Sequence, residues 1–404
     1  MLASQPGSPP RRLHAQRARD ALQDIARGSK PADQILDALF RSHKEMGKRD
    51  RGSVSTLVYG VLRDVGRLQA LAGDAPADWL SRHLADAGHE AATITALDLP
   101  LPAADGAVAA PASCNLPLDL HTRLTQQIGR DETTALAAAL NQAAPTDVRV
   151  NTLKASRDEV LAALTAQGVV AAPTPHSPIG LRLSARLSKQ SSLLLDGEIE
   201  PQDEGSQLLA QLTGAAPGET VIDWCAGVGG KSLAMAAQMG DEGRLIACDT
   251  SASRLAKLLP RAARAGIGCI ETRSHGAESL AGIKAHVVLV DAPCSGTGTL
   301  RRSPELRLRA FDYVALAALQ LQILSEAAAC VRPDGRLIYA TCSLLQEENE
   351  AVVDAFLQAH PEFVAAAGPP EFPAGLLSAQ GRLRLWPHRH GSDGFFAACL
   401  QHRA

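Results

Sequence analysis

The spacing of apolar residues divides the chain into a helical first part and a mixed second part. From Arg12 to about Leu71, apolar side chains recur every three or four positions, which predicts amphipathic helices. Residues 72–118 are rich in Ala, Gly and Pro, and helical spacing returns from Leu124 to Leu140. No run typical of a strand interrupts this stretch. We therefore expect an all-α domain over residues 1–140.

Residues 141–205 combine short strand-like runs with one helical stretch. The segment Val148–Leu153 is strand-like, a helix is expected from Ser156 to about Gln167, and short strands follow up to about Glu200. This pattern predicts a small α+β domain that links the two larger parts of the chain.

From about Ser206, strands and helices alternate. The expected strands are Thr220–Asp223, Arg244–Asp249, Val287–Asp291 and Arg336–Ala340, and the expected helices are Lys231–Met239, Ser253–Ala265 and Tyr313–Val331. Alternation of this kind predicts a mostly parallel, doubly wound sheet. The continuous apolar run Val287–Val290 is typical of a strand that is covered on both faces. We expect residues 206–404 to form one α/β domain.

Charge and cysteine content indicate which ligands and which cell compartment to expect. The net charge of −3 over 404 residues does not by itself indicate a nucleic-acid-binding protein. Lys and Arg nevertheless outnumber Asp and Glu up to Asp74, which favours local phosphate contacts as much as an ordinary solvated helix surface. The eight cysteines include no C-x-x-C pair, so we expect no metal site. Without a signal-like start or a long apolar run, we expect a cytoplasmic monomer with reduced thiols and no membrane association.

Two of the expected strands end in cysteines. Asp291, Pro293 and Cys294 follow one strand, and Cys342 follows the last one. In an open parallel sheet, ligands bind beyond the carboxyl ends of the strands. A free cysteine is more often a small buried hydrophobic residue, but two thiols that each directly follow a strand favour a catalytic site.

The first strand of this domain leads into a glycine-rich turn from Cys225 to Lys231. The turn has the spacing of neither the dinucleotide fingerprint nor the P-loop. Asp249 ends the next strand, where an acid suits the hydroxyls of a ribose. A tight turn and a helix cap are the alternatives for each feature alone. Together they predict a cofactor that contains a nucleoside.

A thiol, a carboxylate and such a cofactor suit methylation at carbon 5 of a pyrimidine. Carbon 5 is a poor nucleophile until a thiolate adds at carbon 6 and raises its electron density. A carboxyl group at the ring nitrogen stabilises the adduct by a hydrogen bond or proton transfer. A methyl group on a sulfonium is then attacked in line, and loss of the carbon 5 proton expels the thiol.

Three motifs resemble the NOL1/NOP2/Sun family of RNA cytosine-5 methyltransferases, and the resemblance covers nearly the whole chain. They are Asp-Ala-Pro-Cys-Ser-Gly-Thr-Gly (291–298), Tyr-Ala-Thr-Cys-Ser (339–343) and Cys-Ala-Gly-Val-Gly-Gly-Lys (225–231). Residues 149–154, 202–207 and 394–396 resemble further family segments. Asp50-Arg51, Tyr59-Gly60 and Leu62-Arg63 resemble the NusB-like domain of bacterial Sun-type enzymes, the 16S ribosomal RNA methyltransferase B-like group.

The resemblance implies a class I Rossmann-like methyltransferase domain, preceded by the α+β linker domain and a NusB-like RNA-binding domain. It implies that Cys342 is the nucleophile, that Cys294 assists release, and that Asp291 touches both the cytosine and the methionine end of S-adenosylmethionine. The residues that would hold this cofactor are Cys225, Ala226, Gly227, Val228, Gly229, Gly230, Lys231 and Asp249, with Arg254 structural. Ribosomal RNA is the leading substrate, and transfer RNA is second.

Two stretches depart from the family or extend it. The family commonly has Ala-Pro at Gly227-Val228, and it has Gly-Asp near the adenine where this chain has Ser274-His275. His275 is thus either an adenine contact or a surface residue. Four arginines that follow Cys294 suit RNA phosphates, with a solvated loop as the alternative: Arg301, Arg302, Arg307 and Arg309.

Two other functions fit the sequence less well. A nicotinamide-dependent dehydrogenase fails on the glycine spacing and leaves two strand-end thiols without a role. A non-catalytic NusB-like RNA-binding protein would be expected to have lost Cys342 or Asp291, and both are present.

Overall fold

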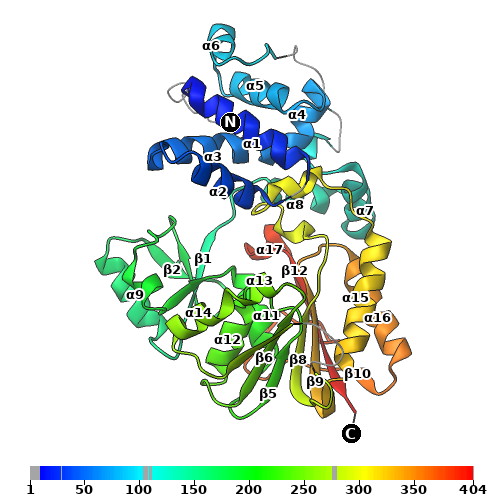
Figure 1. The fold of residues 1–404 in the computed structure, drawn as a ribbon. Helices are drawn as coiled ribbons and strands as arrows, with labels where there is room; N and C mark the ends of the chain where they lie inside the picture. Colours follow the sequence, from blue (N-terminus) through cyan, green and yellow to red (C-terminus); the bar gives the residue numbers. More distant parts are fainter. Residues whose placement is uncertain (1–9, 29, 103–107, 109–111, 275–279, 404) are drawn as a thin grey trace. The chain divides into compact units, whose positions relative to one another are not determined.

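The computed structural model describes residues 10–28, 30–102, 108, 112–274 and 280–403. The chain forms two compact units, one of Met1–Ala143 with Thr299–Ala310 and one of Ala144–Gly298 with Phe311–Ala404 (Figure 1). The segment that follows the Cys294 motif therefore belongs to the unit of the N-terminal helices. The sequence pattern did not predict this return of the chain.

Helices build the first unit, as the apolar spacing predicted. They are α1 (Arg12–Ala26), α2 (Ala32–Ser42), α3 (Lys48–Arg63), α4 (Val65–Ala72), α5 (Pro76–Asp86), α6 (Ala91–Ala96), α7 (Leu118–Ile128) and α8 (Arg130–Leu140), with short 3₁₀ turns at Ala112–Cys114 and Pro304–Leu308. Leu22, Val58 and Trp79 meet in one apolar core. The single helix expected from Leu124 to Leu140 is wrong. Gly129 has φ 82, which breaks the helix into α7 and α8.

A small antiparallel sheet opens the second unit. Its order is β2-β3-β1-β4, with strands β1 (Thr146–Val150), β2 (Ala171–Pro173), β3 (Gly180–Leu183) and β4 (Ile199–Pro201), and with helices α9 (Arg157–Ala166) and α10 (Ser192–Leu195). Ser156 and Glu159 form a capping box that starts α9 where the sequence predicted a helix. Asn151 Nδ2 donates to the carbonyls of Gly197 and Ala265, so the end of β1 is tied to the larger sheet's helices.

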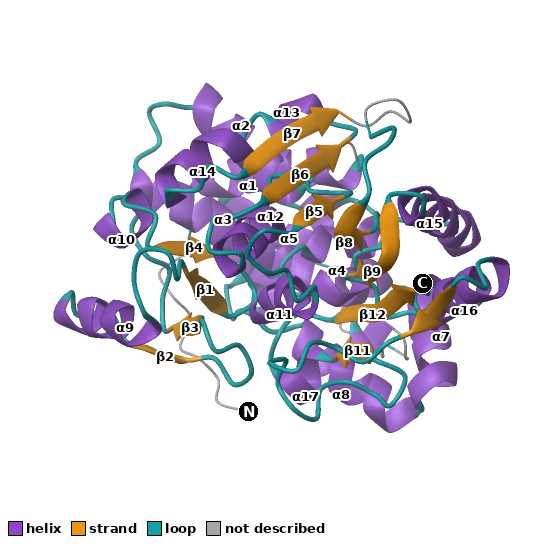
Figure 2. Cartoon of the chain, turned by 90° about the horizontal axis from the view of Figure 1, so that it is seen from below, coloured by secondary structure: helices purple, strands orange, loops and turns teal. Residues whose placement is uncertain are grey.

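The larger sheet has the order β10-β12-β9-β8-β5-β6-β7, with β11 paired to β12. Its strands are β5 (Thr220–Asp223), β6 (Arg244–Asp249), β7 (Ile270–Ser274), β8 (Ala285–Asp291), β9 (Val331–Thr341), β10 (Phe363–Ala365), β11 (Arg382–Leu385) and β12 (Phe395–His402). Strands β9, β8, β5, β6 and β7 run parallel and lie side by side in Figure 2. The strand order reverses direction between β5 and β8, the position where such sheets bind ligands.

Helices cover both faces of this sheet, as the apolar run predicted. They are α11 (Glu204–Leu212), α12 (Gly230–Gln238), α13 (Ala252–Leu255), α14 (Leu258–Ala265), α15 (Tyr313–Ala328), α16 (Glu350–Ala359) and α17 (Pro387–His390), with 3₁₀ turns at Thr297–Thr299 and Gln346–Glu348. Along β8, Val287 and Leu289 join one core cluster, whereas Val288 and Val290 join the other. The helix expected from Ser253 to Ala265 is divided in two. The division places Pro260 in the first turn of α14, where its missing N–H leaves no bond unmade.

Among the residues described above, the structure contains no helix with the length and apolar character needed to span a membrane.

Candidate active site

The two strand-end thiols lie in contact. Adjacent parallel strands β8 and β9 pair Asp291 with Ala340, so the loops that follow both strands leave the same edge of the sheet. The Sγ atoms of Cys294 and Cys342 are 3.4 Å apart. The hydrogen bond to Cys342, together with burial, raises the pKa of Cys294 well above its ordinary value. Cys294 is therefore protonated, and either sulfur can donate in the hydrogen bond between the two thiols.

An ion pair stands beside the thiols. Lys231 Nζ lies 2.6 Å from Asp291 Oδ2, and the two side chains are 13% and 28% exposed. Burial alone would lower the pKa of Lys231, but the attraction and the hydrogen bond of Asp291 outweigh burial and raise this pKa. The glycine-rich turn at the end of β5 thus contributes a fixed positive charge to the edge where β8 ends.

The glycine-rich turn is held by Asp249, which ends β6. Asp249 Oδ2 accepts a hydrogen bond from the Gly227 N–H at 2.9 Å, and Oδ1 accepts one from the Ser251 N–H at 2.8 Å. Gly227 and Gly229 both have positive φ, of 61° and 84°. A Cβ on Gly229 would lie 2.1 Å from Leu258 Cδ1, so this turn needs glycine.

A cavity of about 550 Å³ gathers these groups. Five predicted site residues line it: Cys225, Asp249, Asp291, Cys294 and Cys342. Arg254, whose Nη1 lies 3.4 Å from Asp249 Oδ2, forms another part of the wall. Ala226, Gly227, Val228, Gly229, Gly230 and Lys231 belong to the adjoining turn and do not line the cavity. The prediction for His275 lies outside the described residues.

Sequence reasoning missed one wall of the cavity. Leu319, Gln322, Ile323 and Glu326 of α15 complete the lining. Gln322 Nε2 donates to Glu326 Oε1 at 2.8 Å. The available signal was the spacing of Gln322 and Glu326, four positions apart in a mainly apolar helix, which places both on one face.

A buried carboxylate, Asp223, lies at the end of β5. Its Oδ2 accepts a hydrogen bond from Ser232 Oγ at 2.6 Å, whereas Oδ1 has no partner among the described residues. Burial raises the pKa of Asp223 to about 7. The sequence placed Asp223 at a strand end but gave no reason to expect a carboxyl that is half protonated near neutral pH.

The arginines that follow Cys294 do not share one environment. Arg301 and Arg307 are each only 6% exposed, and both lie in the first unit. The guanidinium of Arg307 donates to four acceptors of that unit, namely the carbonyls of Asn115, Leu140 and Leu300 and Oδ1 of Asn141. Burial lowers the pKa of Arg307 to about 10.

Burial of Arg301 and Arg307 leaves little surface for the predicted phosphate contact. Arg302 is exposed and Arg309 is half-buried. For these two residues the phosphate contact stays a prediction.

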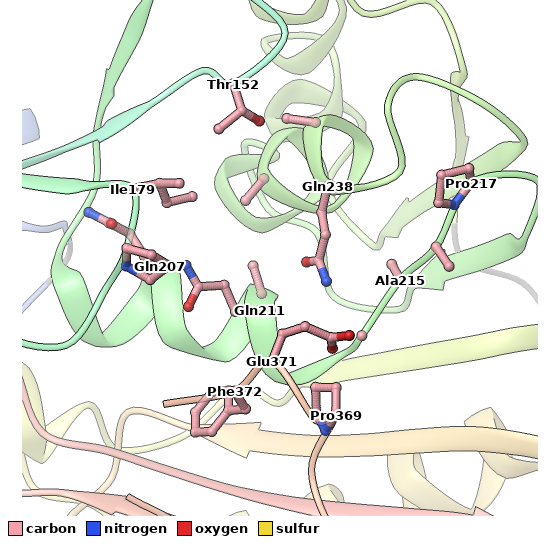
Figure 3. Close-up of a pocket in the computed structure, with 16 residues that line it drawn as sticks. Thr152, Ile179, Gln207, Gln211, Ala215, Pro217, Gln238, Pro369, Glu371 and Phe372 are labelled. Carbon is pink, nitrogen blue, oxygen red and sulfur yellow. The ribbon is translucent and has the colours of Figure 1, made fainter. Parts of the chain in front are cut away.

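A second cavity of about 430 Å³ lies between α11, α12 and the loop that carries Pro369 and Phe372 (Figure 3). Its lining is mainly apolar, with Gln207, Gln211 and Gln238 among the polar side chains. None of the predicted site residues lines it. The groups with reactive chemistry are therefore those of the first cavity.

Two family models and several known proteins match this chain. Residues 210–401 match a family model described as 16S rRNA methyltransferase RsmB/F, and residues 116–189 match the ferredoxin-like domain of RsmF/B-like methyltransferases. A probable ribosomal RNA small subunit methyltransferase B from Synechocystis is 37% identical over 287 residues, which cover 68% of this chain and 64% of that protein. The match thus spans less than two thirds of the relative's length.

Solved structures extend the likeness in three dimensions. The protein PH0851 is 27% identical, with a TM-score of 0.79 and coverage of 96% of this chain and 98% of that chain. NSun6 from Pyrococcus horikoshii, solved with SFG, is 21% identical, with a TM-score of 0.65 and coverage of 71% of this chain and 98% of that chain. At this low identity the likeness supports the fold alone. The resemblance deduced from the sequence motifs is confirmed: residues 210–401 match the methyltransferase domain of the RsmB/F family, and residues 116–189 match its ferredoxin-like domain.

Proposed function

We propose that this protein transfers a methyl group from S-adenosylmethionine to carbon 5 of a cytosine in RNA, most simply a ribosomal RNA. The observation that carries the proposal is the pair of thiols 3.4 Å apart at the ends of adjacent strands, beside the Lys231–Asp291 ion pair. Such a pair suits a reaction in which one sulfur forms a covalent bond and the other stabilises it as a leaving group.

The residues around the first cavity fit the cofactor. Cys225 and Asp249 line the cavity, and the positive φ of Gly227 and Gly229 forms the tight turn beside them that is typical of nucleoside sites. The volume of about 550 Å³ is typical of a small-molecule site. NSun6, of the same fold, was solved with SFG, an analogue of S-adenosylmethionine. When bound, S-adenosylmethionine supplies an electrophilic methyl group. Asp249, at the end of β6, is the acid in position for the ribose.

The reaction begins with addition of Cys342 to the cytosine ring. As a thiolate, Cys342 Sγ forms a bond to carbon 6, and electron density moves to carbon 5, which then takes the methyl group. The S–H of Cys294 donates to Cys342 Sγ and stabilises its thiolate before the attack. Burial of the pair strengthens this hydrogen bond, because the surrounding dielectric constant is low.

The Lys231–Asp291 pair stabilises the charge that develops on the cytosine ring. As the carbon–sulfur bond forms, ring nitrogen 3 becomes more basic. A protonated Asp291 can donate its proton to this nitrogen, and the Lys231 ammonium, 2.6 Å from Oδ2, then stabilises the carboxylate that remains. The proton returns along the same path when the adduct breaks down.

Breakdown of the adduct needs both cysteines. Loss of the carbon 5 proton to a base lets the bond between carbon 6 and Cys342 break, and Cys342 leaves as a thiolate. Cys294, held protonated by its raised pKa, donates to the departing sulfur. Without Cys294 the leaving thiolate is less stable, so the covalent adduct should persist.

The substrate follows from the chemistry and the relatives. The target base must be unpaired or flipped out for a thiol in a cavity to reach carbon 6. The Synechocystis relative is named as a ribosomal RNA small subunit methyltransferase. Ribosomal RNA is thus our first substrate and transfer RNA our second, for a protein we expect to act in the cytoplasm as a monomer.

The decisive experiment is adduct trapping. The full chain, Cys294→Ala, Cys342→Ala and a control variant Cys330→Ala would each be mixed with RNA and S-adenosylmethionine and then denatured. Cys330 lies in an apolar core cluster and does not line the cavity. We expect a denaturation-resistant RNA adduct to accumulate with Cys294→Ala and to be absent with Cys342→Ala.

An adduct that survives loss of Cys342 would overturn the assignment of the nucleophile. Bisulfite sequencing of RNA from cells with and without the protein then identifies the cytosine. Loss of one mark names the substrate, and no lost mark in any RNA of growing cells contradicts the proposed reaction.

A further inference from the structure

We propose that Glu348 is a positioning residue, whose buried carboxylate holds the Cys294 and Cys342 loops at their working separation. The catalytic meaning of this proposal rests on the proposed function, but the geometric claim does not. Glu348 ends the 3₁₀ turn that follows the Cys342 loop, and its side chain is fully buried. No motif in the sequence analysis included it.

The carboxylate of Glu348 joins the two cysteine loops directly. Oε1 accepts the Ser295 N–H at 2.9 Å, and Oε2 accepts the Ser295 hydroxyl at 2.6 Å and also the Ser343 hydroxyl. Ser295 and Ser343 each follow a cysteine immediately in the sequence. One side chain thus bonds to the residue next to each thiol.

The same carboxylate also fastens the loops to α15. Gln320 Nε2 donates to Glu348 Oε1 at 3.0 Å and to the Pro293 carbonyl at 3.0 Å. The hydroxyl of Tyr339 donates to the Glu348 carbonyl at 2.6 Å. The carboxylate therefore receives four hydrogen bonds, which fill its four acceptor positions. All four donors are neutral groups.

This composition suggests positioning rather than stabilisation. Burying a carboxylate is costly, and neutral donors offset the cost less well than a cation does. A carboxylate is, however, the side chain with enough acceptor positions to receive both serine hydroxyls, a backbone N–H and an amide at once. A glutamine in its place would replace one carboxylate oxygen with an NH₂ group. That group would face hydrogen-bond donors and could accept none of their hydrogen bonds.

Precision at this point matters for both sulfurs. The bond that Cys342 forms and the hydrogen bond that Cys294 donates each depend on a separation of 3.4 Å between the Sγ atoms. A displacement of about 1 Å from a reactive geometry can lower a rate about 100-fold. Free loops after two strands would not hold this separation, so a common anchor is required.

Thiol–disulfide exchange measures the separation without RNA or cofactor. The two thiols lose two electrons and two protons to form one disulfide, while one oxidised glutathione takes them up and becomes two reduced glutathiones. The glutathione ratio at half oxidation reports how closely the thiols are held. Differential alkylation and mass spectrometry of the peptides with Cys294 and Cys342 separate this pair from the other six cysteines.

We expect Glu348→Ala to need a buffer at least about tenfold more oxidising, and Glu348→Gln to shift the ratio about threefold. Glu305→Gln is the matched control. Glu305 is also buried, but it lies in the other unit and accepts the Ala32 N–H at 3.3 Å, so the ratio should not move. In RNA methylation, Glu348→Gln should lower kcat and leave KM for RNA unchanged.

An unchanged glutathione ratio in folded Glu348→Ala would overturn the proposal. If that variant does not fold, Ser295→Ala and Ser343→Ala each remove one hydroxyl from Oε2. A shift in either supports the anchor, and wild-type ratios in both overturn it. A wild-type protein that never methylates RNA but shows the Glu348-dependent ratio would contradict the proposed function alone.

Discussion

The segments before and after Gly298 follow one another in the chain, but their side chains lie in different environments. Before it, Asp291 and Cys294 face the cavity where β8 ends. After it, Arg301 and Arg307 are buried in the other unit. A strand end constrains where its next few residues lie, because the sheet fixes the position and direction of the chain. A cluster of like charges carries no such constraint, so its sequence does not reveal whether it is exposed.

The largest effect should come from the nucleophile. We expect Cys342→Ala to lower the rate of methyl transfer to RNA by about 10³-fold or more, because no bond to carbon 6 can form. Transfer of a labelled methyl group under single-turnover conditions measures this rate. Cys330→Ala should keep the wild-type rate. Comparable losses in both variants would mean that the thiol edge has no special role.

Arg307 should matter for folding and not for chemistry. Arg307→Ala leaves three carbonyls and one amide oxygen of the helical unit without their shared donor. Each unsatisfied buried acceptor costs about 1 kcal/mol, so we expect a loss of about 4 kcal/mol in the free energy of unfolding. Urea denaturation followed by circular dichroism measures it. A variant as stable as the wild type would restore Arg307 as a candidate for RNA contact.

The sequence predicted the thiol edge well, because it depends on local rules. Apolar runs located β5, β6, β8 and β9, and parallel pairing then required the ends of β8 and β9 to meet. The glycines of the turn were read correctly for a similar reason. Their positive φ is a property of the residue as much as of the fold.

What the sequence did not predict depends on partners far away in the chain. Glu348 is recognisable only when Ser295, 53 residues earlier, is seen to donate to it. Arg307 is bound by carbonyls more than 160 residues away, at Asn115 and Leu140. Gly129 was a local sign of a break between two helices, but the spacing of the apolar residues around it favoured one continuous helix. Long-range polar contacts leave no periodic trace, whereas apolar faces do.

The buried carboxyl of Asp223, at the end of β5, should make the stability of the protein depend on pH. Its pKa is raised to about 7 in the folded protein, above the ordinary value of 3.8, so the folded state binds the proton more tightly than the unfolded chain. Its contribution to stability is therefore fully present below pH 4 and is lost as the pH rises toward 7.

Asp223→Asn should remove this pH dependence. The folded protein loses about 1.4 kcal/mol for each pH unit between the two pKa values, so we expect the advantage of the variant over the wild type to be about 3 kcal/mol larger at pH 8 than at pH 5. The difference between the two unfolding free energies at each pH isolates Asp223 from the other groups. A difference that does not change between pH 5 and pH 8 would mean that Asp223 titrates alike in both states.

The smallest effect belongs to Arg302, the most exposed of the four arginines that follow Cys294. Arg302 lies beside two buried arginines, yet its side chain is accessible to solvent. If it contacts a phosphate, Arg302→Ala should weaken RNA binding about threefold and reduce the dependence of log Kd on log salt by about one unit. Fluorescence anisotropy over a salt series measures both. The stability of Arg302→Ala should fall less than that of Arg307→Ala. If the salt slope is unchanged, the whole cluster serves the helical unit, and RNA must be held by other residues.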